Sequence, residues 1–142
     1  MIVIDNDHLD YFKNLDNIKK SFNKYVSGLP SDGFLIINND DKNSNELKDN
    51  TRASVISYGI INDSDYMASD INYDIDGCAS FDVIHNGEKL GRIELSVSGE
   101  HNIYNALSAI SLAICYDISF DNIRGSLKEL VFMMIMVIIL RK

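Results

Sequence analysis

The sequence changes from a strand pattern to a helix pattern at Ser98-Gly99, and this change limits the possible folds most. Apolar and polar residues alternate from Arg92 to Val97, which predicts a half-buried strand. After Gly99, apolar residues recur at helical spacing, at Ile103, Leu107, Ile110 and Ile114. A strand that leads directly into an amphipathic helix indicates a fold of the α/β class.

Similar patterns cover the rest of the chain. Buried strands are expected at 33–37 and 53–59, helices at 10–25, 43–49 and 119–130, and alternating strands at 71–75, 79–85 and 90–97. Asn86-Gly87 joins the last two strands, and this dipeptide between alternating runs is typical of a β-hairpin. The sequence therefore predicts buried strands flanked by helices, followed by a hairpin section.

The first turn of the helix after Gly99 is a candidate ligand site. Gly99 permits a tight turn, and the free N–H groups that follow it favour anions. Asn102 and Asn105 are three residues apart, so their amides share one face of the helix, and an amide offers a donor and an acceptor that suit the edge of an adenine. The alternative is that Asn102 only caps the helix and His101 is solvated.

Asn38 to Asp41, after the strand expected at 33–37, allow two interpretations. The carboxylates of Asp40 and Asp41 lie at the carboxyl end of a strand, where a nucleotide could be close. Alternatively, they form a solvated loop that caps the helix expected at 43–49. The sequence favours the second interpretation, a solvated loop that caps the next helix.

Composition narrows the function classes. The chain has 142 residues, of which 46% are hydrophobic, so it can hold one domain with a real core. Its formal net charge of −8 argues against nucleic acid or an anionic membrane as the main partner. Cys78 and Cys115 lack metal-ligand or disulfide-framework spacing, so we expect two buried thiols. The N-terminus has no secretory signal pattern, which makes the cytoplasm the default location.

Two motifs resemble those of the Mur ligases, the ATP-dependent enzymes that build the peptide of bacterial cell-wall precursors. His101-Asn102, followed by Asn105-Ala106, is similar to the family's adenine-contacting motif, and residues 7–12 (Asp-His-Leu-Asp-Tyr-Phe) resemble a second family segment. The resemblance implies that His101, Asn102 and Asn105 bind ATP and that His8 is a ligand of Mg2+. His8 is otherwise a surface histidine in a loop, and Val3 departs from the family's usual asparagine.

The resemblance also implies a fold and a reaction. It implies a mainly parallel sheet flanked by helices plus a small antiparallel sheet, with residues 1–130 as the C-terminal portion of the family's central ATP-binding domain. The version of the motif at residues 7–12 is that of members joining L-alanine to UDP-N-acetylmuramate. The chain contains no Gly-x-x-x-x-Gly-Lys-Thr phosphate loop, so we expect a fragment that is inactive alone. A ligase adding a whole peptide, a non-catalytic nucleotide-binding module and an interaction fragment remain alternatives.

Residues 131–142 do not look like part of a native domain. The apolar run at 130–140 has eleven residues, whereas a membrane-spanning helix needs about twenty. It also lacks a polar face with which to lie on a membrane surface. Codons for this run, shifted in frame, can give Tyr-Asp-Asp-Tyr-Gly-His-His-Pro, which resembles the start of the family's C-terminal domain. We therefore hypothesise that the tail is frameshifted.

Overall fold

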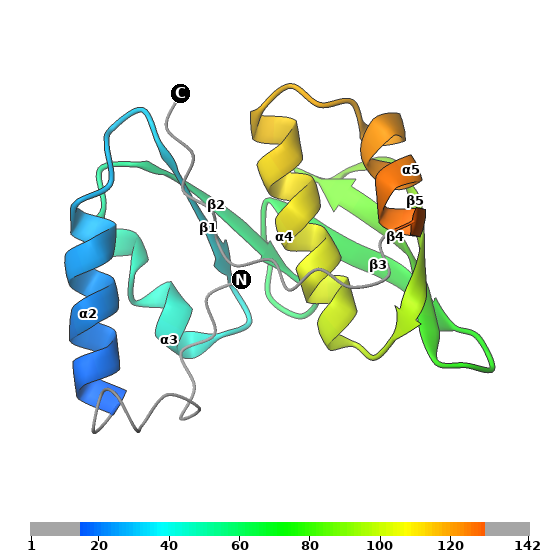
Figure 1. The fold of residues 1–142 in the computed structure, drawn as a ribbon, viewed down its shortest axis with the longest axis horizontal. Helices are drawn as coiled ribbons and strands as arrows, with labels where there is room; N and C mark the ends of the chain where they lie inside the picture. Colours follow the sequence, from blue (N-terminus) through cyan, green and yellow to red (C-terminus); the bar gives the residue numbers. More distant parts are fainter. Residues whose placement is uncertain (1–14, 130–142) are drawn as a thin grey trace.

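The structure is a computed structural model that describes residues 15–129. Its elements are α2 (Leu15–Ser27), β1 (Phe34–Asn38), α3 (Lys42–Asn45), the 3-10 turn η2 (Lys48–Asn50), β2 (Ser54–Gly59), β3 (Tyr66–Tyr73), β4 (Cys78–His85), β5 (Glu88–Ser98), α4 (His101–Cys115) and α5 (Phe120–Glu129). Figure 1 shows α2 and α3 on one side of β1 and β2, and α4 on the other. The predicted α/β class is confirmed.

Within the described residues, the strands form one five-stranded sheet in the order β1-β2-β3-β4-β5. β1, β2 and β3 pair in parallel, whereas β3, β4 and β5 pair antiparallel. The expected parallel and antiparallel parts are therefore both present. The sheet is mixed rather than mainly parallel, however, and the antiparallel part is not a separate sheet.

The two parts of the sheet join at a short overlap between β2 and β3. Tyr58 pairs with Tyr66 and Gly59 with Met67, so β3 begins beside the end of β2 and continues onward. Parallel neighbours that overlap fully need a long crossover connection, whereas this offset needs only a short loop. The Asp65 carboxylate fixes the offset because it accepts hydrogen bonds from the backbone N–H and the hydroxyl of Ser57, both at 2.7 Å.

β3 differs most from its predicted range. It begins at Tyr66 rather than at residue 71 and ends at Tyr73, before the exposed Ile75. A register shift lies between Ser69 and Asn72, with Asp70 at a φ of 47°. It interrupts the alternation of apolar and polar residues, so the sequence pattern does not predict the first half of the strand. The strand ends early because the Asp74 carboxylate accepts the N–H groups of the turn that follows.

The other elements follow the expected patterns more closely. Asn86 and Gly87 have positive φ values of 48° and 85°, as a two-residue hairpin requires, and they join β4 to β5. The helix expected at 43–49 is divided into α3 and η2. Cys78 and Cys115 are free thiols and only partly buried, less than we expected.

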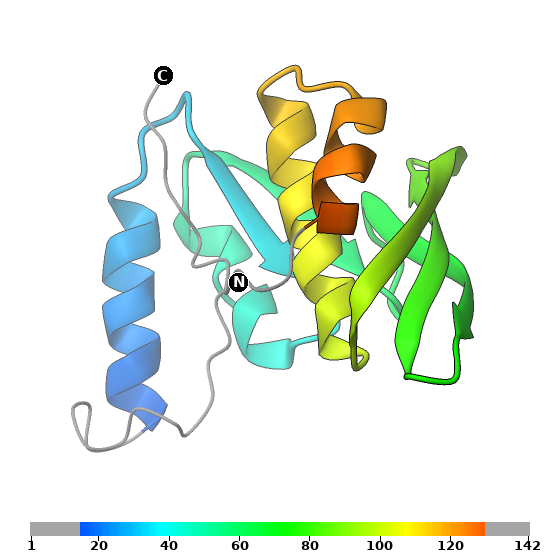
Figure 2. The same ribbon diagram turned by 45° about the vertical axis from the view of Figure 1, so that its right-hand side comes forward.

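β1 divides the interior because its side chains alternate between two cores. Leu35 and Ile37 belong to the core under α2, together with Val26, whereas Ile36 belongs to the core under α4. Figure 2 shows the parallel strands between α2 and α4, with α5 and the antiparallel strands farther along the sheet. β1 and β2 therefore carry helices on both faces, an arrangement typical of parallel strands.

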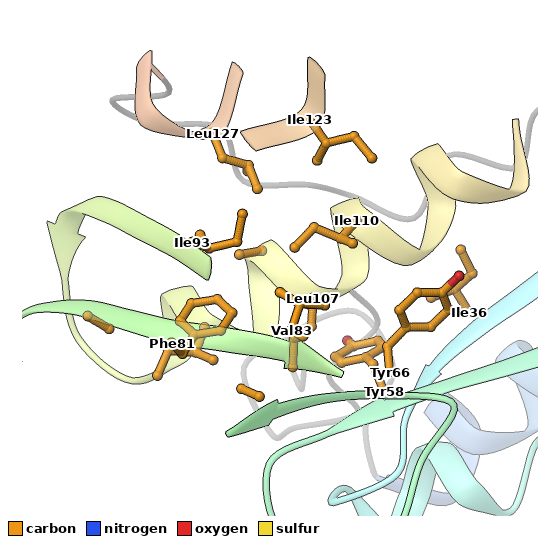
Figure 3. Packing of buried hydrophobic residues seen from close by; sticks show 14 residues of the cluster. Ile36, Tyr58, Tyr66, Phe81, Val83, Ile93, Leu107, Ile110, Ile123 and Leu127 are labelled. Atoms are coloured by element: carbon orange, nitrogen blue, oxygen red, sulfur yellow. The ribbon is translucent and has the colours of Figure 1, made fainter. Parts of the chain in front are cut away.

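α4 provides the centre of the larger core. Ile103, Leu107 and Ile110 are fully buried, as the helical stripe predicted, and Ile114 packs against their cluster. Figure 3 shows Leu107 and Ile110 among the side chains of β4, β5 and α5. Because full burial of such a side chain contributes about 1.5–3 kcal/mol, the stripe holds α4 firmly on the sheet.

Candidate functional site

The candidate site lies at the carboxyl ends of the parallel strands. β1 and β2 are parallel and in register, so the loops that follow Asn38 and Gly59 lie at the same edge of the sheet. The first turns of α4 reach this edge, because the Tyr104 hydroxyl donates a hydrogen bond of 3.0 Å to Asp40 in the loop after β1. The topology thus brings the predicted helix start to the edge where α/β folds bind their ligands.

The amides of Asn102 and Asn105 form a bonded pair on the first turn of α4. Asn102 Nδ2 donates to the Ser98 carbonyl at 2.7 Å, and Asn105 Nδ2 donates to Asn102 Oδ1 at 3.2 Å. Both residues are half-buried. Within residues 15–129, Asn105 Oδ1 accepts no hydrogen bond. The pair therefore orients the Asn105 amide while its oxygen and one hydrogen stay available.

His101 is the first residue of α4, so the helix places it close to Asn102 and Asn105. Its side chain is exposed. Its ring lies over Gly99, where an added Cβ would be 2.6 Å from His101 Cε1. Gly99 has a φ of 103°, which confirms the predicted tight turn. Asn102 does not cap the helix, because the N-cap position is Glu100, which makes no side-chain capping bond.

Asp40 was not predicted as a site residue, yet it links three segments at this edge. Its Oδ2 accepts the N–H groups of Ile60 at 2.7 Å and Ile61 at 3.1 Å, and its Oδ1 accepts that of Asn62 at 2.7 Å. Burial opposes ionisation of Asp40, but these backbone donors and the Tyr104 hydroxyl outweigh it and hold the pKa of the carboxyl below its usual value. Asp40 is therefore an anion at neutral pH.

Asp41 has the capping role that the sequence suggested. Its carboxylate accepts the N–H groups of Asn43 and Ser44, each at 3.1 Å, and the Ser44 hydroxyl, which satisfies the first turn of α3. The interpretation of the whole segment as a solvated loop is wrong for Asp40, whose four donors come from elsewhere in the fold. Two neighbouring aspartates thus have separate tasks.

Two buried tyrosines, Tyr58 and Tyr66, lie in the core between the sheet and α4. Tyr58 is 1% exposed and makes a side-chain hydrogen bond with Ser108 of α4, and burial raises the pKa of Tyr58 to about 12. Tyr66 stacks on His85 with ring centroids 4.2 Å apart, and burial raises the pKa of Tyr66 to about 12. Both phenols stay neutral at physiological pH, so they serve as scaffold between the sheet and α4.

The magnesium prediction cannot be placed in the described structure. His8 and the tail at 131–142 both lie outside the described residues. Within residues 15–129, no cluster of three His, Cys, Asp or Glu side chains could hold a metal.

An open hollow lined by Ser31 and Arg52 lies before the starts of β1 and β2, at the opposite edge from Asn105. Within the same range, no helix is long and apolar enough to cross a membrane.

The fold is an α/β domain whose candidate polar groups gather at the carboxyl ends of its parallel strands. The family model described as the Mur ligase middle domain matches residues 1–113. The chain therefore belongs to the Mur ligase family, as its motifs predicted.

Curated relatives support the same assignment. The UDP-N-acetylmuramate--L-alanine ligase of Caldanaerobacter subterraneus is 43% identical over 126 residues, which cover 89% of this chain and 27% of that protein. The ligase of the same name from Clostridium acetobutylicum is 46% identical over 126 residues, with the same coverage. The chain therefore spans about a quarter of the length of these relatives.

Solved structures share the fold. MurF from Acinetobacter baumannii matches with a TM-score of 0.77 and 22% identity, over 92% of this chain and 28% of that chain. The UDP-N-acetylmuramate-alanine ligase MurC from Thermotoga maritima matches with a TM-score of 0.70 and 22% identity, over 87% of this chain and 26% of that chain. The mixed sheet with its helices is thus the fold of Mur ligase structures.

Proposed function

We propose that this chain contributes the adenine-binding part of an ATP-dependent ligase. The whole enzyme would join L-alanine to UDP-N-acetylmuramate in peptidoglycan precursor synthesis. Family membership and the relatives named above support this reaction. ATP would supply the phosphoryl group that activates the muramate carboxylate for attack by the alanine amine, a reaction proposed for the cytoplasm. The chain would correspond to the C-terminal portion of the middle domain.

The Asn102–Asn105 pair is the observation that carries the proposal for this chain. An asparagine amide can bind adenine with two hydrogen bonds, because adenine offers the N6 donor beside a ring-nitrogen acceptor. Asn105 has its Oδ1 and one Nδ2 hydrogen available within the described residues, and Asn102 fixes the orientation of its amide. Guanine has an acceptor, O6, in place of the N6 donor, so the same amide would bind it less well.

The rest of the ATP site is also part of the proposal. His101 would lie beside the nucleotide at the exposed start of α4, where the positive end of the helix dipole favours anions. His8 would be a ligand of Mg2+, a role that rests on the residues 7–12 motif alone.

A titration with nucleotide tests the proposal. The purified 142-residue chain is titrated with ATP and with GTP, each with magnesium, while backbone and side-chain amide chemical shifts are recorded. We expect saturable shifts in residues 99–107 and weaker binding of GTP. Asn105→Ala should weaken ATP binding by about tenfold, since a hydrogen bond of this kind contributes about 1 kcal/mol or more.

Asn122→Ala is the matched control. Asn122 is also an asparagine in the first turn of a helix, but it lies in α5 and is exposed. The short connection from Cys115 to Phe120 places the start of α5 at the far end of α4, away from Asn105. Its replacement should leave ATP affinity unchanged. A folded chain that ignores ATP, or an Asn105→Ala variant that binds as the wild type does, would refute the proposed site.

A further inference from the structure

The Asp40 carboxylate has more partners than a surface loop requires. Its two oxygens accept three successive N–H groups, from Ile60, Ile61 and Asn62, in the loop after β2. The fourth donor is the Tyr104 hydroxyl of α4, at 3.0 Å. One side chain thus joins the ends of β1 and β2 to the helix that carries the candidate amides.

The end of β2 is shaped to admit this carboxylate. Gly59 is the last residue of β2, and an added Cβ there would lie 3.1 Å from both oxygens of Asp40 and 3.0 Å from Ser64 Oγ. Contacts of this length are tighter than ordinary packing, so any larger residue would push the carboxylate away. Glycine at this position therefore leaves room for the bonds of Asp40.

Tyr104 connects this arrangement to the nucleotide site. It lies between Asn102 and Asn105 in the chain, within the first two turns of α4. α4 also has a polar contact with β2 farther along, between Ser108 and Tyr58. The Tyr104–Asp40 bond is nearer to the amides, so it holds the polar face of the first turn of α4, beside the apolar contact of the buried Ile103.

We propose that Asp40 is a positioning residue of the nucleotide site. By holding Tyr104, its carboxylate fixes the start of α4 against the loop at residues 60–62, and thereby fixes where Asn105 presents its amide. This inference rests on the proposed function. It assigns Asp40 no contact with ATP, and its effect on binding passes through Tyr104 and α4.

The test compares Tyr104→Phe, Asp40→Asn and the control Asp41→Asn in the full chain. Tyr104→Phe removes only the link to α4 and leaves the three N–H bonds of Asp40 intact. Asp41 is a neighbouring carboxylate whose bonds lie within α3, so its substitution matches the loss of charge without disturbing α4. ATP and GTP affinities and thermal stability are measured for each variant.

We expect Tyr104→Phe and Asp40→Asn to weaken ATP binding several-fold to about tenfold, and the ratio of ATP to GTP affinity to fall toward one. The double variant should be little worse than the weaker-binding of the two single variants, because Tyr104→Phe removes, and Asp40→Asn weakens, the same link. Asp41→Asn should keep both affinities. A merely structural role would lower stability without changing the preference for ATP.

Two negative results have different meanings. If the wild type binds ATP through Asn105, but folded Tyr104→Phe binds ATP and GTP as the wild type does, the positioning role is refuted and the proposed function stands. If the wild type itself binds no ATP, the proposed function fails and this inference fails with it. Should Asp40→Asn not fold, Tyr104→Phe still decides, because it leaves the loop bonds in place.

Discussion

Replacing Gly99 by alanine should destabilise the domain, whereas the same change at Gly125 should stabilise it. Gly99 has a φ of 103°, which residues with a Cβ rarely adopt, and the new Cβ would lie 2.6 Å from His101 Cε1. Gly125 lies inside α5, where an added Cβ meets nothing within 4 Å. The same substitution is therefore strained at Gly99 and unstrained at Gly125.

The expected size follows from the backbone around Gly99. Its N–H donates to the Gly77 carbonyl at 3.2 Å, and its carbonyl accepts the Asn102 N–H at 3.0 Å, so the turn has little freedom to relax. A residue held in such a conformation costs about 1–3 kcal/mol, and the reduced entropy of the unfolded chain offsets part of this. We therefore expect a net loss of about 2 kcal/mol for Gly99→Ala.

Gly125→Ala should instead gain about 0.5–1 kcal/mol, the difference in helix propensity between the two residues. Urea unfolding followed by circular dichroism measures both changes. For a domain of this size, a loss of about 2 kcal/mol lowers Tm by about 5–10 °C. If Gly99→Ala were as stable as the wild type, or if both variants shifted in the same direction, the reasoning from backbone conformation would be wrong.

Two further changes test the core and the carboxylate at the sheet edge. Leu107→Ala, at a fully buried position of α4, should cost about 2–5 kcal/mol in urea unfolding because it opens a cavity in the larger core. The pKa of Asp40 is lower in the folded chain than its ordinary value of 3.8, so its charge stabilises the fold above that pH and this contribution is lost as the pH falls through the folded pKa. The stability difference between the wild type and Asp40→Asn, measured by urea unfolding, should therefore shrink on acidification.

Local sequence patterns correctly predicted those elements whose structure depends on residues close together in the sequence. The stripe from Ile103 to Ile110 identified α4 and its buried face, since helical spacing follows directly from the residues themselves. Asn86-Gly87 identified its hairpin, because the turn needs two positive φ values that this pair adopts easily. Gly99 predicted the turn before the candidate site for the same reason.

The mixed sheet could not be predicted in the same way. The register shift between Ser69 and Asn72 reverses which residues face the core, so the alternation in β3 is visible only after the shift. The continuity of the sheet depends on the pairing of Tyr58 with Tyr66, and that pairing needs the Asp65 carboxylate to hold the two strands in their offset. Neither feature produces a periodic pattern in the sequence.

Asp40 and Asp41 show the same limit within the site. The partners of Asp41 are two and three residues away, so a helix-capping pattern reveals them. The partners of Asp40 are 20 to 22 residues away in the loop after β2 and 64 residues away at Tyr104. Gly59 is the sequence feature near β2 that relates to these contacts, because a residue without a Cβ leaves space for the Asp40 carboxylate at the end of β2. Here the Asp40 side chain, from the loop after the neighbouring strand β1, lies against Gly59 and links the sheet to the proposed adenine site.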